Sequence, residues 1–212
     1  MVTCKEVKEI LREISLIINK KKLYLSELDT SIGDGDHGLN LSKGFNAVEE
    51  KIENISDKDI GNIFEVTGMT LVETVGGASG PLYGTAFMKA STVVNKKSSI
   101  DMNDFLQILA EALNGIKIRG EAKEGEKTMI DTLSPVVNEL KKDLEEGRDS
   151  NYIFEDLKYI ARKGMESTRD IIATKGRASY LKERSIGYKD PGATSMYYIL
   201  DTVFDYILNK MN

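Results

Sequence analysis

The stretch MYYILDTVFDYIL, residues 196–208, places an apolar side chain at every third or fourth position. This spacing matches the 3.6-residue period of an α-helix with one buried face. Similar apolar stripes recur in residues 7–18, 105–116, 130–140 and 154–165, and shorter candidate helices cover residues 38–53, 59–75 and 80–95. No stretch shows the alternation typical of a β-strand. The sequence therefore predicts an all-α fold of about eight helices, joined by mostly short loops into an antiparallel bundle.

The bulk composition indicates what kind of protein this is. A chain of 212 residues with 41% hydrophobic residues has enough apolar material for a single domain, residues 1–212. The net charge of −5 and the absence of a basic stretch exclude a typical nucleic-acid-binding protein. No apolar run approaches the roughly 20 residues that span a bilayer, and the N-terminus lacks the apolar core of a signal peptide. Cys4 is the single cysteine, which is typical of a reducing compartment, so we expect a cytoplasmic protein. The lysines at 20–22 are expected to mark a solvated helix end.

The three prolines predict local features of the chain. Pro81 suits the first turn of a helix, where its missing N–H has no partner to lose. Pro135 lies inside an apolar stripe and is expected to kink that helix or to begin a shorter one. Pro191 predicts a turn just before Thr194 and Ser195, which are candidate caps of the last helix.

An unusual loop lies at GDGDHG, residues 33–38, which contains three glycines, two aspartates and the only histidine. With Asp29, it brings together three carboxylates, which repel one another unless a cation neutralises them. Oxygen ligands of this kind suit Mg²⁺ or Ca²⁺. The spacing does not fit an EF-hand, and the sequence lacks the histidines and cysteines that a zinc site requires. The alternative is a capped turn, in which Asp34 or Asp36 only caps the following helix.

Two further loops have compositions that suit an anionic ligand. VGGASGPLYGT, residues 75–85, predicts accessible N–H groups at a helix N-terminus, where phosphate binds readily, although its small residues could instead allow close helix packing. Residues 175–195, here called the lid, carry five basic residues and three glycines. The composition is typical of a mobile lid that closes over an anion, and a disordered surface loop is the alternative.

A fourth loop, GEAKEGEKT at residues 120–128, nearly matches the phosphate-binding P-loop. Glu126 interrupts the pattern and a helix, not a strand, precedes it, so we reject a P-loop here and expect at most a wall of the same site. A metal site, a phosphate-type loop and a basic lid together predict a nucleotide bound through Mg²⁺. Three carboxylates are generous for one ion and reasonable for two.

The motifs IGDGDHGLN, GGASGPLYGT, GEKTMIDTLSP and GRASYLKERSIGYKDPGATS occur in this order along the chain. In this the sequence resembles the ADP-binding L subunits of dihydroxyacetone kinases over essentially its whole length. The resemblance implies an eight-helix antiparallel barrel that holds the nucleotide and two Mg²⁺ ions in a pocket at one end. That fold agrees with the number of helices predicted from periodicity.

The resemblance also implies roles for individual residues. The Mg²⁺ ligands are expected to be Asp29, Asp34 and Asp36. Residues expected to contact ADP or ATP are His37, Gly38, Leu39, Asn40, Ala78, Ser79, Gly120, Met129, Arg177, Asp190, Pro191 and Gly192. Arg177 is the expected catalytic residue, and His37 is expected to position the nucleotide or cap a helix rather than to carry a phosphoryl group. Lys182 and Tyr188 depart from the family pattern, which often has glycine and histidine there.

In this family the sugar, dihydroxyacetone, is bound by a separate K subunit, to which the L subunit delivers the γ-phosphoryl group. In the phosphotransferase-linked version, ADP stays bound and a phosphohistidine on an M subunit converts it to ATP in place. Two alternatives within the same superfamily are the nucleotide domains of ATP-dependent dihydroxyacetone kinases and of fatty-acid kinases. A non-catalytic ADP-sensing module is a third alternative. Contact with a transcription regulator and a homodimer also remain open.

Overall fold

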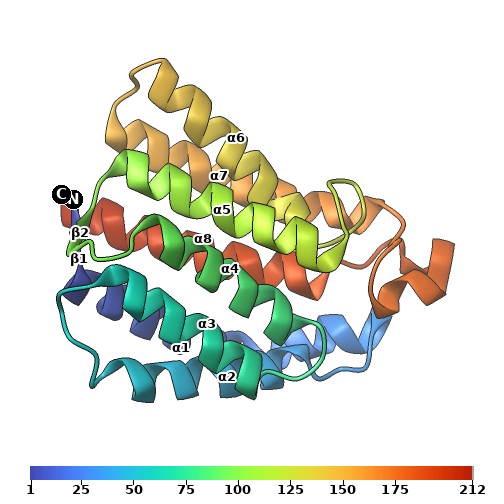
Figure 1. Ribbon diagram of the computed structural model, residues 1–212. Helices are drawn as coiled ribbons and strands as arrows, with labels where there is room; N and C mark the ends of the chain where they lie inside the picture. Colours follow the sequence, from blue (N-terminus) through green and yellow to red (C-terminus); the bar gives the residue numbers. More distant parts are fainter. Residues whose placement is uncertain (212) are drawn as a thin grey trace.

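The computed structural model describes residues 1–211, which form eight α-helices (Figure 1). The helices are α1 (Cys4–Ile32), α2 (His37–Ile52), α3 (Ile60–Thr74), α4 (Ser79–Val93), α5 (Met102–Gly120), α6 (Ile130–Glu145), α7 (Ser150–Ser167) and α8 (Pro191–Met211). Two 3₁₀ helices, η1 (Thr168–Asp170) and η2 (Arg177–Ser185), lie between α7 and α8. The predicted all-α fold and its number of α-helices are confirmed. Within residues 1–211, no helix combines the length and apolar character needed to cross a lipid bilayer.

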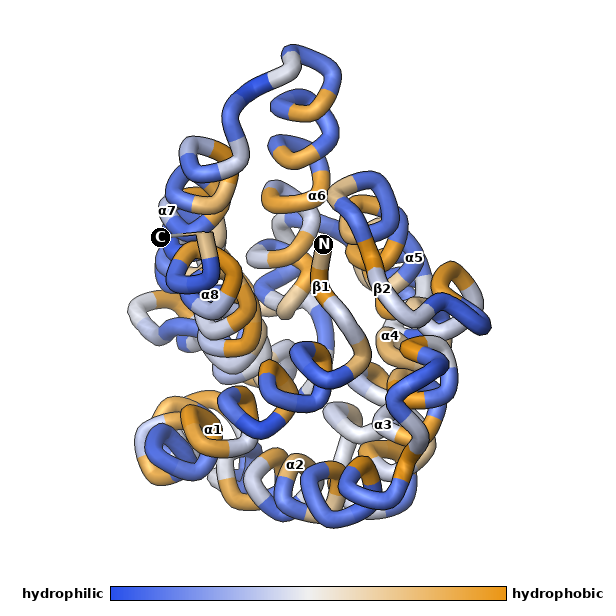
Figure 2. The backbone as a smooth tube through the Cα atoms, turned by 90° about the vertical axis from the view of Figure 1, so that its left-hand side faces the viewer, coloured by the Kyte–Doolittle hydropathy of each residue, from blue (hydrophilic) through white to orange (hydrophobic). Residues whose placement is uncertain are grey.

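The helices follow one another around a ring. Each packs against the next, and α8 returns to pack against α1 (Figure 2). Apolar faces point into the ring because each helix carries the apolar stripe seen in the sequence. On one side of the interior Phe105, Phe154 and Phe204 pack together, with ring centroids 5.9 to 6.4 Å apart.

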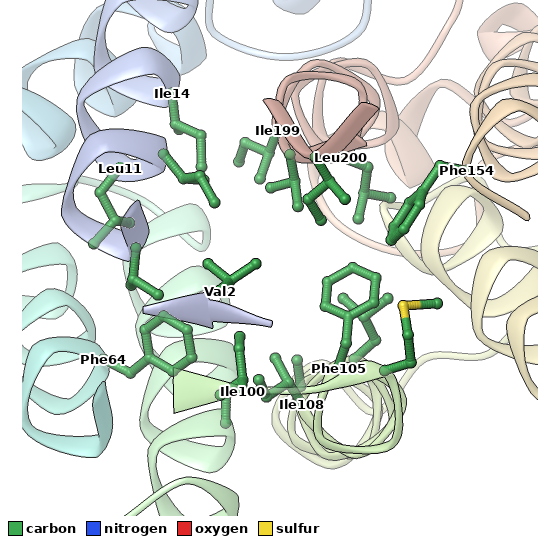
Figure 3. Close-up of a pocket in the computed structure, with 18 of the residues that line it drawn as sticks. Val2, Leu11, Ile14, Phe64, Ile100, Phe105, Ile108, Phe154, Ile199 and Leu200 are labelled. Atoms are coloured by element: carbon green, nitrogen blue, oxygen red, sulfur yellow. The ribbon is translucent and has the colours of Figure 1, made fainter. Parts of the chain in front are cut away.

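The interior of the ring is apolar and encloses a cavity of about 310 Å³ (Figure 3). Its wall includes Leu11, Ile14, Phe64 and Ile199. Near the chain termini, a short antiparallel pair of strands, β1 (Val2–Thr3) and β2 (Ser99–Ile100), contributes Val2 to this wall. Two-residue strands are too short to show alternation, so the sequence did not reveal them.

Helix α1 is longer than its apolar stripe suggested. Lys20–Lys22 were expected at a helix end but lie within α1, so that prediction is wrong. Lysine is a good helix former, and Ile18 and Leu25 keep the buried face continuous on either side. With no glycine or proline before Gly33, nothing in the sequence ends the helix earlier.

Helix α6 continues through Pro135, so the expected start of a shorter helix there is wrong. Proline removes the hydrogen bond that would be accepted by the carbonyl of Asp131. Helix α7 approaches this carbonyl closely at Gly164, where a Cβ would lie 2.4 Å from the oxygen. Tertiary packing of the two helices therefore outweighs the local cost of the proline.

Helix α8 begins at Pro191, earlier than expected. The carboxylate of Asp190 accepts the N–H of Ala193 at 2.6 Å, so Asp190 caps the helix. Thr194 and Ser195 lie buried in its first turn, and their expected role as caps is wrong.

Candidate metal and anion site

A cavity of about 540 Å³, with charged side chains in its wall, lies at the end of the barrel away from β1 and β2. Because the helices alternate in direction, α2, α4, α6 and α8 all begin at this end, and His37, Ser79, Ile130 and Pro191 all line the cavity. The positive ends of four helix dipoles thus lie around one space. The lid covers its side with Lys175, Gly176, Arg177 and Ala178.

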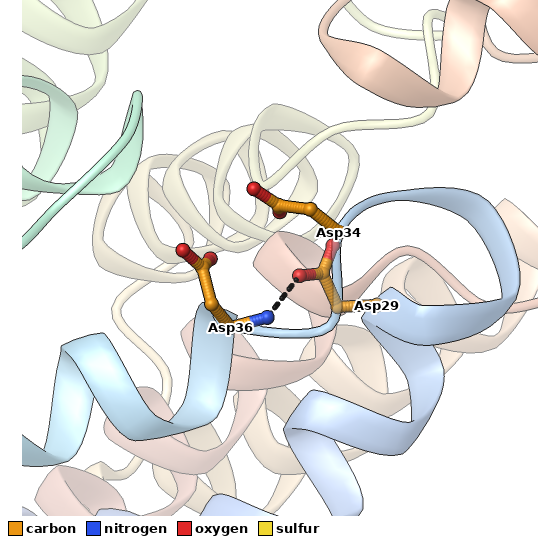
Figure 4. A group of neighbouring side chains, drawn as sticks. All are labelled: Asp29, Asp34 and Asp36. Carbon is orange, nitrogen blue, oxygen red and sulfur yellow. Dashed lines mark hydrogen bonds between the residues drawn. The ribbon is translucent and has the colours of Figure 1, made fainter.

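Three carboxylates converge on this cavity (Figure 4). Ligand oxygens of Asp29, Asp34 and Asp36 lie within 4.8 Å of one another. Asp29 is buried in the last turn of α1, and its carboxylate lies against Gly33, where a Cβ would be only 2.1 Å from Oδ1. Gly35 has φ of +80°, a conformation that suits glycine and reverses the chain between Asp34 and Asp36. The glycines of this loop therefore allow the three acids to converge.

Asp29 caps helix α2 as well as facing the cavity. Its Oδ2 accepts the N–H groups of Asp36 at 3.0 Å and His37 at 3.2 Å. Burial raises the pKa of the Asp29 carboxyl, the hydrogen bond from His37 opposes this, and the charge of Asp34 raises it further. Asp36 makes no side-chain capping bond. Asp29 therefore does the capping that the alternative interpretation assigned to Asp34 or Asp36, and the carboxylates of Asp34 and Asp36 face the cavity.

The lid supplies a cation to this cluster. The guanidinium of Arg177 lies 2.9 Å from Oδ2 of Asp34. The lid is folded against the barrel, because Ala178, together with Ala173 just before the lid, is buried against Ile32 at the end of α1. Thus the structure does not support the alternative of a disordered surface loop. Lys182 has φ of +50°, a backbone conformation that fits the glycine common at this family position.

His37 is held by hydrogen bonds to two serines. Its Nδ1 lies 3.0 Å from Ser79 Oγ and its Nε2 2.8 Å from Ser195 Oγ, which in turn is 2.8 Å from the hydroxyl of Tyr83. Burial lowers the pKa of His37 to about 4, so the ring is neutral at physiological pH. With both nitrogens occupied, His37 links α2, α4 and α8 beneath the cavity.

Helix α4 presents an uncapped N-terminus to the cavity. Its N-cap residue, Ala78, makes no side-chain capping bond. The first N–H groups of a helix have no intrahelical partner, so those of α4 are available to an anion. At the start of α6, by contrast, Thr128 accepts the N–H of Ile130 with its hydroxyl and the N–H of Asp131 with its carbonyl. Together with Ser79, the start of α4 therefore forms the side of the cavity that suits phosphate.

The structure brings most of the expected site residues together. The cavity wall includes Asp29, Asp34, Asp36, His37, Ala78, Ser79, Gly120, Met129, Arg177, Asp190, Pro191 and Gly192. It does not include Gly38, Leu39 and Asn40. Gly38 packs against the backbone of Lys22 in α1, the Leu39 side chain is half-exposed, and Asn40 lies beside Gly76. Their contact with a nucleotide stays a prediction.

Sequence reasoning missed several residues of the site. Arg119, at the end of α5, adds a basic group to the wall, and a basic residue in the last helical turn was a visible signal. Tyr83 and Ser195 lie 112 positions apart, and nothing in the sequence indicated their contact. Asp190, by contrast, was an expected site residue, and its surroundings change its acidity. Burial raises the pKa of the Asp190 carboxyl to about 7, and the hydrogen bond from the Ala193 N–H opposes this.

An all-α barrel with a carboxylate cluster, a free helix N-terminus and a basic lid at one end is a domain suited to a metal-bound, phosphate-bearing ligand. The chain belongs to the DAK2 domain family, whose model matches residues 31–205. It is 45% identical over 184 residues to "PEP-dependent dihydroxyacetone kinase, ADP-binding subunit DhaL" of Escherichia coli, covering 87% of this chain and 88% of that protein. It is also 39% identical to "PTS-dependent dihydroxyacetone kinase, ADP-binding subunit DhaL" of Lactococcus lactis, covering 98% of this chain and 100% of the relative.

A solved structure shares the fold. The crystal structure of the dihydroxyacetone kinase of C. freundii matches with a TM-score of 0.73 at 23% identity. The match covers 96% of this chain and 34% of that longer chain. A second crystal structure of that kinase is a complex with AMP-PNP and Mg²⁺, and matches with a TM-score of 0.70.

Proposed function

We propose that this chain is the nucleotide-binding subunit of a phosphoenolpyruvate-dependent dihydroxyacetone kinase, with ADP or ATP held through two Mg²⁺ ions. The observation that carries the proposal is the convergence of Asp29, Asp34 and Asp36 in one cavity with the uncapped N-terminus of α4. The names of the relatives, which share 39 to 45% identity over most of their length, support the same function.

The donor set fits Mg²⁺. All three candidate ligands are carboxylates, the donors that hard divalent cations prefer. Arg177 already lies against Asp34, which indicates that the cluster requires a positive charge. When bound, Mg²⁺ neutralises phosphate charge and ties the nucleotide to the carboxylates. Asp34 and Asp36 are the more accessible ligands, whereas Asp29 also holds the start of α2.

The residues around the cluster have separate tasks in this proposal. The free N–H groups at the start of α4 bind phosphate oxygens, and neutral His37 holds Ser79 in place. Arg177 is the catalytic residue: its guanidinium leaves Asp34 and stabilises the charge on the transferred phosphoryl group. Phosphoryl transfer requires alignment and charge neutralisation more than a protein nucleophile, and this cavity offers both.

The proposed partners are a sugar-binding K subunit, which presents dihydroxyacetone, and a phosphohistidine-bearing M subunit, which rephosphorylates bound ADP. The main alternative is an ATP-dependent kinase subunit. The chain is 45% identical to the E. coli subunit and 35% identical to the "Probable dihydroxyacetone kinase" of Dictyostelium discoideum, which supports the first assignment. A regulatory ADP-sensing module would use the same binding residues without transferring phosphate.

The test is reconstitution of the full chain with purified K and M subunits, dihydroxyacetone and either phosphoenolpyruvate or ATP as the donor. We expect dihydroxyacetone phosphate to form from phosphoenolpyruvate with less ADP than product, because bound ADP is rephosphorylated in place. Formation from ATP alone would support the ATP-dependent alternative. Tight Mg-ADP binding without any transfer would support the regulatory module instead.

A further inference from the structure

Lys127 belongs to the P-loop-like stretch 120–128, and the proposed site gives it no role. Its side chain is 1% exposed, although lysine is rarely buried without partners. The ammonium donates hydrogen bonds to the main-chain carbonyls of Thr168, Ile171 and Tyr188. Its three N–H groups therefore all have backbone partners, which offsets the cost of removing the charge from water.

These three carbonyls come from both ends of one loop. We use the name neck for residues 168–171 and 187–190, the two chain segments between which the greater part of the lid extends. Thr168 and Ile171 lie in the first segment of the neck and Tyr188 in the second. The two segments also bond to each other, because Gly187 N–H donates to the Arg169 carbonyl at 2.8 Å and Asp190 N–H donates to Thr168 Oγ1 at 3.0 Å. The Lys127 ammonium thus lies where the two segments of the neck meet.

The backbone around Lys127 is shaped for this contact. Gly125 and Lys127 have φ of +84° and +63°, and the second value is unfavourable for a residue with a side chain. The carboxylate of Asp131 holds the turn by accepting the N–H of Thr128 at 2.7 Å. The carbonyl of Glu126 accepts the N–H of Thr174 at 3.4 Å, which makes a second link, just before the start of the lid. A strained turn held in this way at a cavity wall indicates a functional requirement.

The charges around the ammonium favour the same arrangement. Burial lowers the pKa of Lys127, while the carboxylates of Asp190, Asp170 and Asp131 oppose this. Asp170 and Asp190 belong to the two segments of the neck. A positive charge at Lys127 therefore attracts both segments, through their carbonyls and through their carboxylates.

We propose that Lys127 is a positioning residue: its ammonium holds the neck closed and so keeps Arg177 at the cavity, where its guanidinium can move from Asp34 to the transferred phosphoryl group. The inference rests on the proposed function, since it gives a role in phosphoryl transfer to a residue that touches no reacting atom. Without the ammonium, three carbonyls of the neck lose their donor and the two segments of the neck separate. Arg177 then loses its fixed place, and a displacement of about 1 Å at a reacting centre lowers rates by about 10²-fold.

The chain offers a matched control in Lys8, which is 6% exposed. Its ammonium donates to the carbonyl of Ile55 and lies 2.7 Å from the Asp57 carboxylate, at the opposite end of the barrel. Replacing Lys8 also removes a buried ammonium from a backbone carbonyl, but the neck and the cavity are untouched. Comparing Lys127→Met with Lys8→Met therefore separates positioning of the lid from general stability.

The first measurement is amide hydrogen exchange of the nucleotide-free full chain, read by mass spectrometry. We expect exchange in residues 171–190 to be at least about tenfold faster in Lys127→Met, and unchanged in Lys8→Met, because local opening follows the loss of local contacts. An unchanged lid, or an increase spread over all the helices, would overturn the proposal. If Lys127→Met does not fold, Lys127→Gln, which keeps an N–H donor, is measured by the same criteria.

The second measurement is phosphoryl transfer with the K and M subunits. We expect kcat of Lys127→Met to fall about 10²-fold, with the Kd for Mg-ADP close to that of the wild type. Combining it with Arg177→Gln should cost no more than Arg177→Gln alone, since Lys127 acts through Arg177. Additive losses would overturn the proposal. If the wild type transfers no phosphate, the proposed function fails, while the exchange measurement still tests Lys127.

Discussion

Two groups of three acids in this molecule have similar composition and different surroundings. Asp29, Asp34 and Asp36 form one, and the other consists of Glu139 and Asp143 on α6 with Asp156 on α7. In both groups the ligand oxygens lie within 4.8 Å of one another, and in both an arginine pairs with one acid. We call the first the loop cluster and the second the helix cluster.

The difference lies in what surrounds the acids. The loop cluster lines a cavity of about 540 Å³ that also contains helix N-termini and the lid. The helix cluster lines none of the three main pockets of the described chain. The Asp143 side chain has no exposed surface, and its Oδ1 lies 3.2 Å from Nε of Arg148. Three acids therefore do not define a site unless there is space beside them for a ligand and donors for its phosphates.

The largest expected effect separates the two arginines. Arg177→Gln should lower kcat for phosphoryl transfer by about 10³-fold, because a guanidinium that stabilises transition-state charge contributes at least that much in related chemistry. Arg148→Gln should leave kcat unchanged and lower the melting temperature, since Asp143 loses its countercharge. Steady-state kinetics of both variants with the K and M subunits measures this. Equal effects on kcat would remove the distinction between the clusters.

A second prediction concerns ligand binding by the acids. Asp34→Asn should weaken Mg-ADP binding by more than about 10²-fold, because loss of even an outer-shell partner of a metal typically costs 10- to 100-fold. Asp143→Asn should bind Mg-ADP like the wild type. Isothermal titration calorimetry with excess Mg²⁺ gives both affinities. Circular dichroism should show the same helix content in each variant, since Asp34 lies in a loop and accepts no capping bond.

A smaller effect concerns stability and pH. Burial raises the pKa of Asp143 above its ordinary value, Glu139 raises it further, and Arg148 opposes this. The folded state therefore binds a proton that the unfolded state releases, so this carboxyl favours folding at low pH and that contribution is lost as pH rises through its folded pKa. Asp143→Asn should gain stability relative to the wild type at pH 7 and lose that gain toward pH 4. Thermal melts across this range, with Ca²⁺ and Mg²⁺ absent, test the sign.

Much of the fold could be predicted from the sequence because each helix carries its own apolar stripe. The starts of α2, α3 and α4 fall within one residue of the expected positions. The loop cluster was also predictable, since its acids and glycines lie within eight consecutive positions, 29–36. Local patterns of this kind can be recognised without knowing which helices pack together.

Other features depend on tertiary contacts that no local pattern shows. The helix cluster joins Asp156 to acids of another helix, and the hydrogen bonds of His37 reach Ser195, 158 positions away. Lys127 drew attention only as an imperfect P-loop, because its burial depends on carbonyls 41 to 61 positions further along the chain. The expected start of a shorter helix at Pro135 was wrong for the same reason, because α6 continues there while packed against α7.

The loop cluster, and not the helix cluster, is expected to hold metal and nucleotide. Native mass spectrometry of the wild type, Asp34→Asn and Asp143→Asn, each incubated with ADP and Mg²⁺, tests this expectation in one measurement. We expect one ADP with two Mg²⁺ ions per chain in the wild type and in Asp143→Asn, and neither in Asp34→Asn. ADP and Mg²⁺ retained by Asp34→Asn, or lost from Asp143→Asn, would contradict it.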